Sequence, residues 1–236
     1  MGRILHHILF LLLIFFINPA AADETDWSEK KLGKAIIHAE KAAARKNWSR
    51  AIIYGEKALR ASSVLDQKTD ARYINMLKNL NRYYDKAGRL QEVAARVRAA
   101  YFLSREHLGP GHETTMINRR LYYKLLIARK AYEKAIPLVL ENIDIIKKND
   151  GPEYKLHHYL TQLFSLYGLT EQLAAQETSL LELLELNEKL FGKNDESSSE
   201  IRIILAKNYC RQNKIDEFVK INKKYNLQYT CVINER

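Results

Sequence analysis

The strongest constraint on the fold is an internal repeat with a period close to 42 residues. A bulky apolar or aromatic residue follows a short polar turn five times, with spacings of 42, 42, 41 and 42: Trp48, Leu90, Tyr132, Leu173 and Ile215. A second, independent series consists of glycines in turns, with spacings of 42 and 41: Gly109, Gly151 and Gly192. Two series that share one period indicate a chain built from about five copies of one structural unit.

Each unit has the pattern of two helices joined by a turn. In the second unit, Leu77, Leu80 and Tyr84 recur at the spacing of one helix face. Glycine tolerates the positive φ found after helix C-termini, so Gly88 predicts the end of this helix. The apolar spacing then resumes at Leu90, Val93, Val97 and Ala100. One such hairpin buries too little to be stable alone, so we expect an all-α fold, an α-solenoid of about five stacked helix-turn-helix repeats.

The composition agrees with helices and excludes several other classes. The 236 residues include nine glycines and four prolines, which is few for the many turns of an all-β fold. Hydrophobic residues make up 47%, too many for a disordered chain, and two cysteines are too few for a small disulfide scaffold. The property that bears on function is the net charge of +10.

The first 22 residues have the pattern of a secretory signal peptide. Arg3 is followed by ten consecutive apolar residues, Ile8 to Ile17, and then by a helix-breaking Asn-Pro pair. Small residues at Ala20 and Ala22 fit a cleavage site near Ala22. A transmembrane helix would need about 20 apolar residues, about twice the length of this run. We therefore expect an exported protein, periplasmic or secreted, with a repeat domain at 23–224 and a C-terminal tail at 225–236 that packs on the last repeat.

Export changes which partners the positive charge favours. A basic protein in the cytoplasm would suggest nucleic acid, whereas an exported one favours acidic proteins, polyanionic glycans or anionic membrane surfaces. The charge is also uneven, because residues 28–107 carry a net charge of +10 and residues 169–200 carry −6. This polarity allows self-association or attraction within a curved solenoid, or it is a drift in composition, and the sequence leaves these alternatives open.

The segment Leu77 to Val93 and the linker Leu108 to His112 resemble the tetratricopeptide repeat (TPR), in the 42-residue form found in kinesin light chains. The resemblance covers about residues 28–224. Its departures from the family pattern are His38, at a usually aliphatic core position, and Arg119 and Arg202, which replace bulky apolar residues. In the fourth unit, the register of the first helix has two alternatives. Leu160, Leu163 and Tyr167 fit one, and Gly168 fits the other.

The resemblance implies that the first helix of each pair lines a concave groove that binds peptides. The positions that correspond to groove-facing residues of the family are Asn75, Lys78, Arg82, Lys86, Arg120, Lys124, Lys207 and Arg211. Lys78 and Arg82 are four residues apart, as are Arg120 and Lys124, so each pair projects from one helix face. These two pairs predict a ladder of positive charge across neighbouring repeats, and a solvated basic surface is the alternative.

No catalytic or metal-binding pattern is present in the sequence. His157 and His158 are adjacent, so on a helix they point about 100° apart and cannot share one metal ion. We find no glycine-rich phosphate loop, nucleophile elbow or Cys-x-x-Cys pair. We therefore expect no enzyme activity, no cofactor and no metal.

The two cysteines, Cys210 and Cys231, lie in the fifth unit and in the tail. In an oxidising compartment they are expected either to form a disulfide that folds the tail over the last repeat or to remain free thiols. Closing a loop of this length would stabilise the fold by about 3 kcal/mol in the chain-entropy model.

Two functions remain after these exclusions. The first is an exported, non-enzymatic scaffold or adaptor that binds an acidic peptide or protein segment in its concave groove. The alternative is an envelope structural protein that binds polyanionic glycan or anionic membrane through its basic N-terminal half, as a peripheral protein. Nucleic acid is not expected as a partner in either case.

Overall fold

The computed structural model describes residues 26–65 and 70–231, and helices are the only regular secondary structure in these ranges. Ten α-helices form five consecutive pairs, and one 3₁₀ turn, η2 (Leu90–Val93), precedes α4. The helices are α1 (Glu29–Ala44), α2 (Trp48–Val64), α3 (Ala71–Lys86), α4 (Ala94–Leu108), α5 (Glu113–Ala128), α6 (Tyr132–Lys148), α7 (Glu153–Leu169), α8 (Leu173–Phe191), α9 (Glu196–Arg211) and α10 (Ile215–Tyr225).

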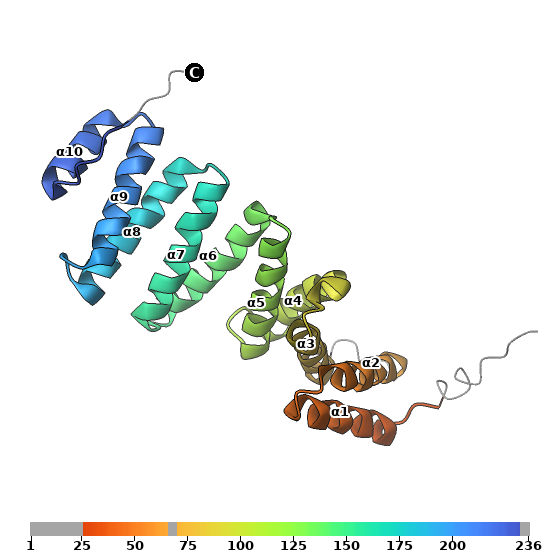
Figure 1. Ribbon diagram of the computed structural model, residues 1–236. Coiled ribbons are helices and arrows are strands. Elements are labelled where there is room, and N and C mark those ends of the chain that lie inside the picture. The colour runs from red at the N-terminus through yellow and green to blue at the C-terminus, as the bar shows by residue number, and fades with distance from the viewer. Residues whose placement is uncertain (1–25, 66–69, 232–236) are drawn as a thin grey trace, which may run out of the picture.

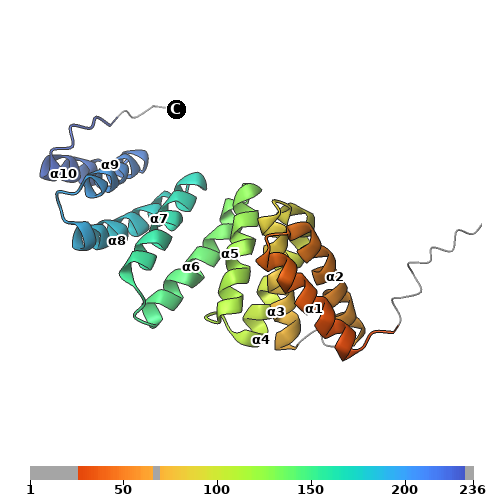
Figure 2. The ribbon, with the colours of Figure 1, turned by 60° about the horizontal axis from the view of Figure 1, so that its bottom comes forward.

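The pairs stack in chain order into an elongated, curved array with α1 and α2 at one end and α9 and α10 at the other (Figure 1). Figure 2 shows the same order from a second direction. Four of the five sequence markers are the first residue of the second α-helix of a pair, and the fifth, Leu90, opens the 3₁₀ turn before α4. The prediction of an all-α solenoid of helix-turn-helix units is confirmed.

The turn inside each pair repeats at the level of the backbone. One residue with positive φ occurs in each turn, at spacings of 42, 42, 41 and 42: Lys46, Gly88, Lys130, Glu171 and Asn213. Only the second repeat has glycine at this position, so the other four turns hold a side chain in the left-handed region. The sequence therefore signalled one of five equivalent turns through its glycine, and the repeat period located the others.

The core follows the helix faces expected from the apolar spacing. Leu77 and Leu80 in α3 are 5% and 1% exposed, and Leu160 and Leu163 in α7 are 1% and 5% exposed. The first of the two alternative registers is therefore the one that the fourth repeat adopts. Gly168 lies within α7, where an added Cβ would be 2.5 Å from the side-chain nitrogen of Gln176.

The three departures from the family pattern have different outcomes. His38 is exposed, not in the core, and its ring stacks on Tyr54 with centroids 5.0 Å apart. Arg119 and Arg202 do occupy buried positions, at 0% and 6% exposure. The core accepts these two arginines because their guanidinium groups are bonded to carboxylates and backbone carbonyls, as described below.

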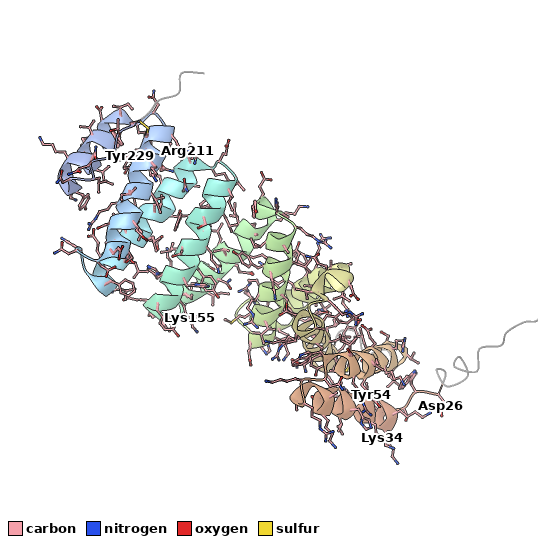
Figure 3. All side chains as sticks on the ribbon, in the orientation of Figure 1. Asp26, Lys34, Tyr54, Lys155, Arg211 and Tyr229 are labelled. Atoms are coloured by element: carbon pink, nitrogen blue, oxygen red, sulfur yellow. A yellow bond between two sulfur atoms is a disulfide. The ribbon has the colours of Figure 1, made fainter. Side chains whose placement is uncertain are left out.

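The described part of the tail packs on the last repeat. Helix α10 includes Tyr225 and ends where Asn226 takes a left-handed conformation. Asn222 holds the returning chain, because its amide donates to the Tyr229 carbonyl at 2.8 Å and its oxygen accepts from the Tyr229 amide at 3.3 Å. Cys210 and Cys231 form a disulfide with their Cα atoms 5.7 Å apart. Figure 3 shows Arg211 and Tyr229 at the same end of the molecule as this disulfide.

The expected signal peptide at residues 1–22 lies outside the described residues. Within the described ranges, no helix is both long and apolar enough to cross a membrane.

Candidate functional site

The face formed by the first helices of the repeats, α3, α5, α7 and α9, is called the groove face here. Two contacts fix α3 beside α5 on this face. The Thr114 hydroxyl donates to the Asn75 side-chain oxygen at 2.8 Å, and the Lys124 ammonium lies 2.5 Å from a carboxylate oxygen of Asp85. Both contacts join residues 39 apart in the sequence, so the two helices run side by side with a constant offset.

The predicted basic ladder is present in part. Arg82 and Arg120 are exposed and form no ion pair within the described part of the chain, whereas Lys124 is paired with Asp85. Lys78 is half-buried and donates to Asn75 at 3.2 Å. Its free charge is thus less available than that of the two arginines.

Burial lowers the pKa of Lys78 below its ordinary value, and the nearby positive charge of Arg82 acts in the same direction. The carboxylate of Glu113 opposes both effects without cancelling them. Lys78 is consequently an ammonium that a neighbouring anion would stabilise, because its present surroundings favour the charge less than water does.

A hollow of about 460 Å³ opens on the groove face between α5 and α7. Its walls combine apolar and aromatic side chains with two cations, one acid and a few other polar groups: Glu113, Met116, Ile117, Arg120, Tyr123, Lys124, Ile127, Asn142, His158, Tyr159 and Gln162. Met116 is 38% exposed although it is a large apolar residue. The hollow therefore offers apolar surface beside the charge of Arg120.

Asn142 reaches this hollow from α6 because the buried Arg119 holds it. The Arg119 guanidinium donates to the side-chain oxygen of Asn142 and, at 2.6 Å, to the carbonyl oxygen of Pro110. The same guanidinium lies 2.7 Å from a carboxylate oxygen of Glu141. Since the oxygen of Asn142 is occupied, its amide nitrogen is the group that remains to donate to a ligand.

Glu141 is the centre of a buried polar cluster behind the hollow. It accepts a hydrogen bond from the Tyr101 hydroxyl at 2.6 Å and another from Arg105 at 2.6 Å. Burial alone would raise the pKa of Glu141, but these two hydrogen bonds and the charges of Arg119 and Arg105 together lower it. The carboxylate of Glu141 is thus kept ionised, and the positive charges of Arg105 and Arg119 balance it within the protein.

The remaining predicted groove residues do not join this site. The α7 positions equivalent to Arg120 and Lys124 are Thr161 and Ser165, whose hydroxyls donate to carbonyls of their own helix. Because α7 offers no cation at these positions, it separates the cations of α3 and α5 from those of α9.

On α9, the nitrogen of Lys207 lies 5.6 Å from the ring centroid of Tyr229 in the tail, and Arg211 lies 3.9 Å from Glu171. Lys86 is exposed in the last turn of α3. The cations of α3 and α5 therefore lie apart from those of α9 along the groove face, with the hydroxyl side chains of α7 between them.

A second hollow, of about 850 Å³, lies on the opposite face between α4 and α6. Tyr122 of α5 forms part of its lining, while the adjacent Tyr123 lines the groove-face hollow. Phe102 and Leu140 on its walls are 48% and 41% exposed. Its two acids, Glu141 and Asp144, are both paired, the second with Lys148 at 2.9 Å.

The adjacent histidines have separate environments. His157 is 2.8 Å from the side-chain oxygen of Asn187 and packs edge-on against Phe191, while His158 contacts Gln162 at 2.9 Å. In the described ranges, no group of three or more His, Cys, Asp or Glu side chains is placed to hold a metal ion.

No protein-family model matches the chain, and no curated protein sequence matches it. Solved structures do match. Two crystal structures from Podosopora anserina, described as a kinesin light chain with nearly identical TPR-like repeats, each have 14% sequence identity and a TM-score of 0.56. The matches cover 82% and 85% of this chain and 92% and 98% of those chains. The chain has a TPR-like fold.

A crystal structure of BtubC (BKLC) from P. vanneervenii is also similar, with a TM-score of 0.47 and 16% identity over 88% of this chain and 95% of that one. At these identities the similarity establishes the fold, and the ligand has to be argued from the residues of the site.

Sequence reasoning missed Asn142 and the apolar half of the groove-face hollow. Asn142 belongs to a second helix, and the groove prediction considered first helices alone. The available signal was Arg119 at a core position, because a buried guanidinium requires hydrogen-bond acceptors nearby. The apolar residues had no separate signal, since a core pattern and a groove pattern share the same helical spacing.

Proposed function

We propose that this TPR-like chain is an exported, non-enzymatic scaffold or adaptor that binds an acidic peptide or protein segment on its groove face. The observation that carries the proposal is the groove-face hollow, where Arg120 lies beside exposed apolar surface. Arg82 on the neighbouring helix α3 supplies a second exposed cation without an ion pair among the described residues. A carboxylate between α3 and α5 would gain charge-assisted hydrogen bonds.

Apolar contacts would supply much of the affinity. Met116, Ile117 and Tyr159 line the hollow and can cover a bulky side chain of the ligand. The amide of Asn142 adds a donor for a peptide carbonyl. We therefore expect the bound segment to combine at least one carboxylate with a large apolar residue nearby, since an exposed ion pair alone contributes little.

The test uses an array of short peptides in which acidic and aromatic residues are varied, probed with the purified chain at physiological salt. The site variant is R82E with R120E. A matched control is K220E with K223E, which makes the same change in net charge on exposed lysines of α10. Acidic, aromatic peptides should bind the wild type and the control and lose at least tenfold in affinity for the site variant.

Equal binding by all three proteins would reject the groove site. Export is tested separately by fractionating cells that express the full chain and sequencing the N-terminus of the product. A mature chain that begins near Asp23 outside the cytoplasm is the expected result, and an intact Met1 in the cytoplasm would contradict export.

The alternative, an envelope structural protein, has one observation in its favour. Helices α1 and α2 and the turn between them carry exposed cations without ion pairs within the described residues, including Lys41, Arg45 and Arg50. Binding to every anionic polymer or vesicle with equal affinity would favour this alternative over a selective adaptor.

A further inference from the structure

The turn between α1 and α2 forms a small, strongly basic hollow that the groove site does not include. Its volume is about 250 Å³, and its lining is His38, Lys41, Ala42, Arg45, Asn47 and Arg50. Three of these six residues are lysine or arginine, and none is acidic. It lies on the hairpin at the N-terminal end of the array, where Figure 3 labels Lys34 and Tyr54.

None of the carboxylates of these two helices lines the basic hollow. Glu29 is paired with Arg72 at 3.0 Å. Glu40 lines a different hollow, together with Tyr83 of α3. Glu56 is paired with Arg96 at 2.7 Å. The cations of the basic hollow therefore have no internal counter-ion within the described chain.

The backbone amides of the turn are bonded within the protein, so side chains have to supply the donors to a ligand. The amide of Asn47 donates to the carbonyl of Ala42 at 2.9 Å, and the amide of Lys46 donates to Ala43 at 2.9 Å. The side-chain oxygen of Asn47 accepts from the backbone amide of Arg50 at 3.1 Å. The side-chain amide nitrogen of Asn47 is thus the group of this residue that is left to donate to a ligand in the hollow.

Tyr54 orders two walls of the hollow. Its ring stacks on His38 with an interplanar angle of 27°, and the guanidinium carbon of Arg50 lies 5.7 Å from its centroid. A cation held over an aromatic face keeps its charge and loses side-chain freedom before a ligand arrives. This arrangement explains why His38 occupies an exposed position instead of the aliphatic core position that the sequence suggested.

We propose that this basic hollow binds a single phosphate or sulfate ester group. Arg45 and Arg50 each offer a planar fork of donors that matches two oxygens of such a group, and Lys41 adds a compact positive charge. A phosphate or sulfate ester exposes three terminal oxygens, enough for all three cations, whereas a carboxylate exposes two. The hollow is concave and small, so it selects one anionic group instead of a flat charged surface.

The primary experiment titrates the isotope-labelled chain with inorganic phosphate, sulfate and acetate at constant ionic strength, and follows backbone amides by NMR. Saturable shifts confined to residues 45–50 are expected with phosphate and sulfate, with acetate at least tenfold weaker. The site variant is R45Q with R50Q. The matched control is R98Q with K134Q, which removes two cations that line the hollow between α4 and α6 and have no ion pair among the residues that the structure describes.

The site variant should weaken phosphate binding at least tenfold, and the control should leave it unchanged. Shifts that never saturate, that spread over the surface, or that the control abolishes equally would overturn the proposal. The groove variant R82E with R120E must retain phosphate binding, so this site and the peptide-binding function can fail independently.

Two further arms identify the source of the ester group. One uses vesicles of a zwitterionic lipid with an anionic phospholipid, and the other uses heparin as a sulfated polymer. Binding that the site variant loses and the control retains supports the hollow and shows which carrier it accepts. If the site variant still binds the vesicles or the heparin, that carrier binds elsewhere on the surface, and this result counts against the hollow as its binding site.

Discussion

Two buried arginines share one structural role in different repeats. Arg119 and Arg202 are at equivalent repeat positions, and each donates to the backbone carbonyl of the residue nine positions earlier, Pro110 or Lys193. Each is also paired with a glutamate, Glu141 or Glu188, at 2.7 Å. The corresponding positions in α3 and α7 carry leucines, so the arginines replace apolar packing with bonds that hold the preceding linker.

Removal of Arg119 tests this role. The side chain is 1% exposed, and its loss leaves the linker carbonyl of Pro110 without its donor and Glu141 with one cation fewer. We expect R119A to lower the free energy of unfolding by about 3–5 kcal/mol, as is usual when one partner of a buried ion pair is removed. The measurement is chemical denaturation at neutral pH.

The neighbouring R120A is the control, because Arg120 is exposed and should change stability by no more than about 0.5 kcal/mol. If R119A is as stable as R120A, Arg119 does not hold the linker.

Tyr101 provides a prediction about pH. Burial, the hydrogen bond to Glu141 and the charge of that carboxylate raise the pKa of Tyr101 from 10.0 to about 12. Because the pKa is higher in the folded protein, the associated stability is fully present below pH 10 and is lost as the pH rises through about 12. The absorbance at 295 nm of the wild type minus that of Y101F should show one tyrosine ionising near pH 12.

The same subtraction in concentrated urea serves as the control. There the lost tyrosine should ionise near pH 10, the ordinary value for an exposed phenol. A folded-state difference that also appears near pH 10 would mean that Tyr101 is not enclosed beside Glu141.

At the level of elements, the C-terminal tail completes the last hairpin. Leu227, Tyr229 and Cys231 pack against the C-terminal part of the core, and the Tyr229 ring lies edge-on to Phe218 with centroids 6.0 Å apart. An array of repeats leaves apolar surface at each end, so a terminal segment that covers it stabilises the whole stack.

The disulfide between α9 and the tail allows a specific test. C231S removes a link between residues 21 apart in sequence, and the chain-entropy model gives a loss of about 3 kcal/mol in the free energy of unfolding. C210S and the double variant should lose the same amount, because all three remove one bond. Denaturation of the oxidised protein provides the measurement.

Mass spectrometry after alkylation without reductant is the complementary check. It should find no alkylated cysteine in the native protein. Two alkylated thiols, or losses that add in the double variant, would contradict the link.

At the scale of the whole molecule, the uneven charge found in the sequence is partly neutralised between neighbouring helices. Three glutamates of the acidic helix α8 are paired with cations of α6, α9 and the loop that follows α9: Glu182 with Lys147, Glu188 with Arg202 and Glu177 with Lys214. These contacts explain part of the acidic stretch without a second molecule. Helices α1 and α2 differ, since several of their cations lie unpaired around the basic hollow within the described chain.

The sequence by itself determined the helices, their pairing and the stacking order. A bulky residue recurs where each second helix begins because every repeat ends its turn at that point and buries a similar helix face. This requirement is local to the repeat. Leu77 and Leu160 illustrate it, since both are buried as their spacing predicts. Because the same local requirement applies in every repeat, the residues that meet it recur in the sequence at a fixed spacing.

Only the tertiary structure decided which charges remain available to a ligand. Arg82 and Lys124 are at equivalent repeat positions, yet Lys124 is paired with Asp85 of the neighbouring helix α3, whereas Arg82, on that same helix, has no ion pair within the described residues. His38 stacks on Tyr54 outside the core, although the family pattern has a core residue at this position. The physical reason is that an ion pair or a ring contact depends on the separation of side chains across helices, which the period of one helix does not encode.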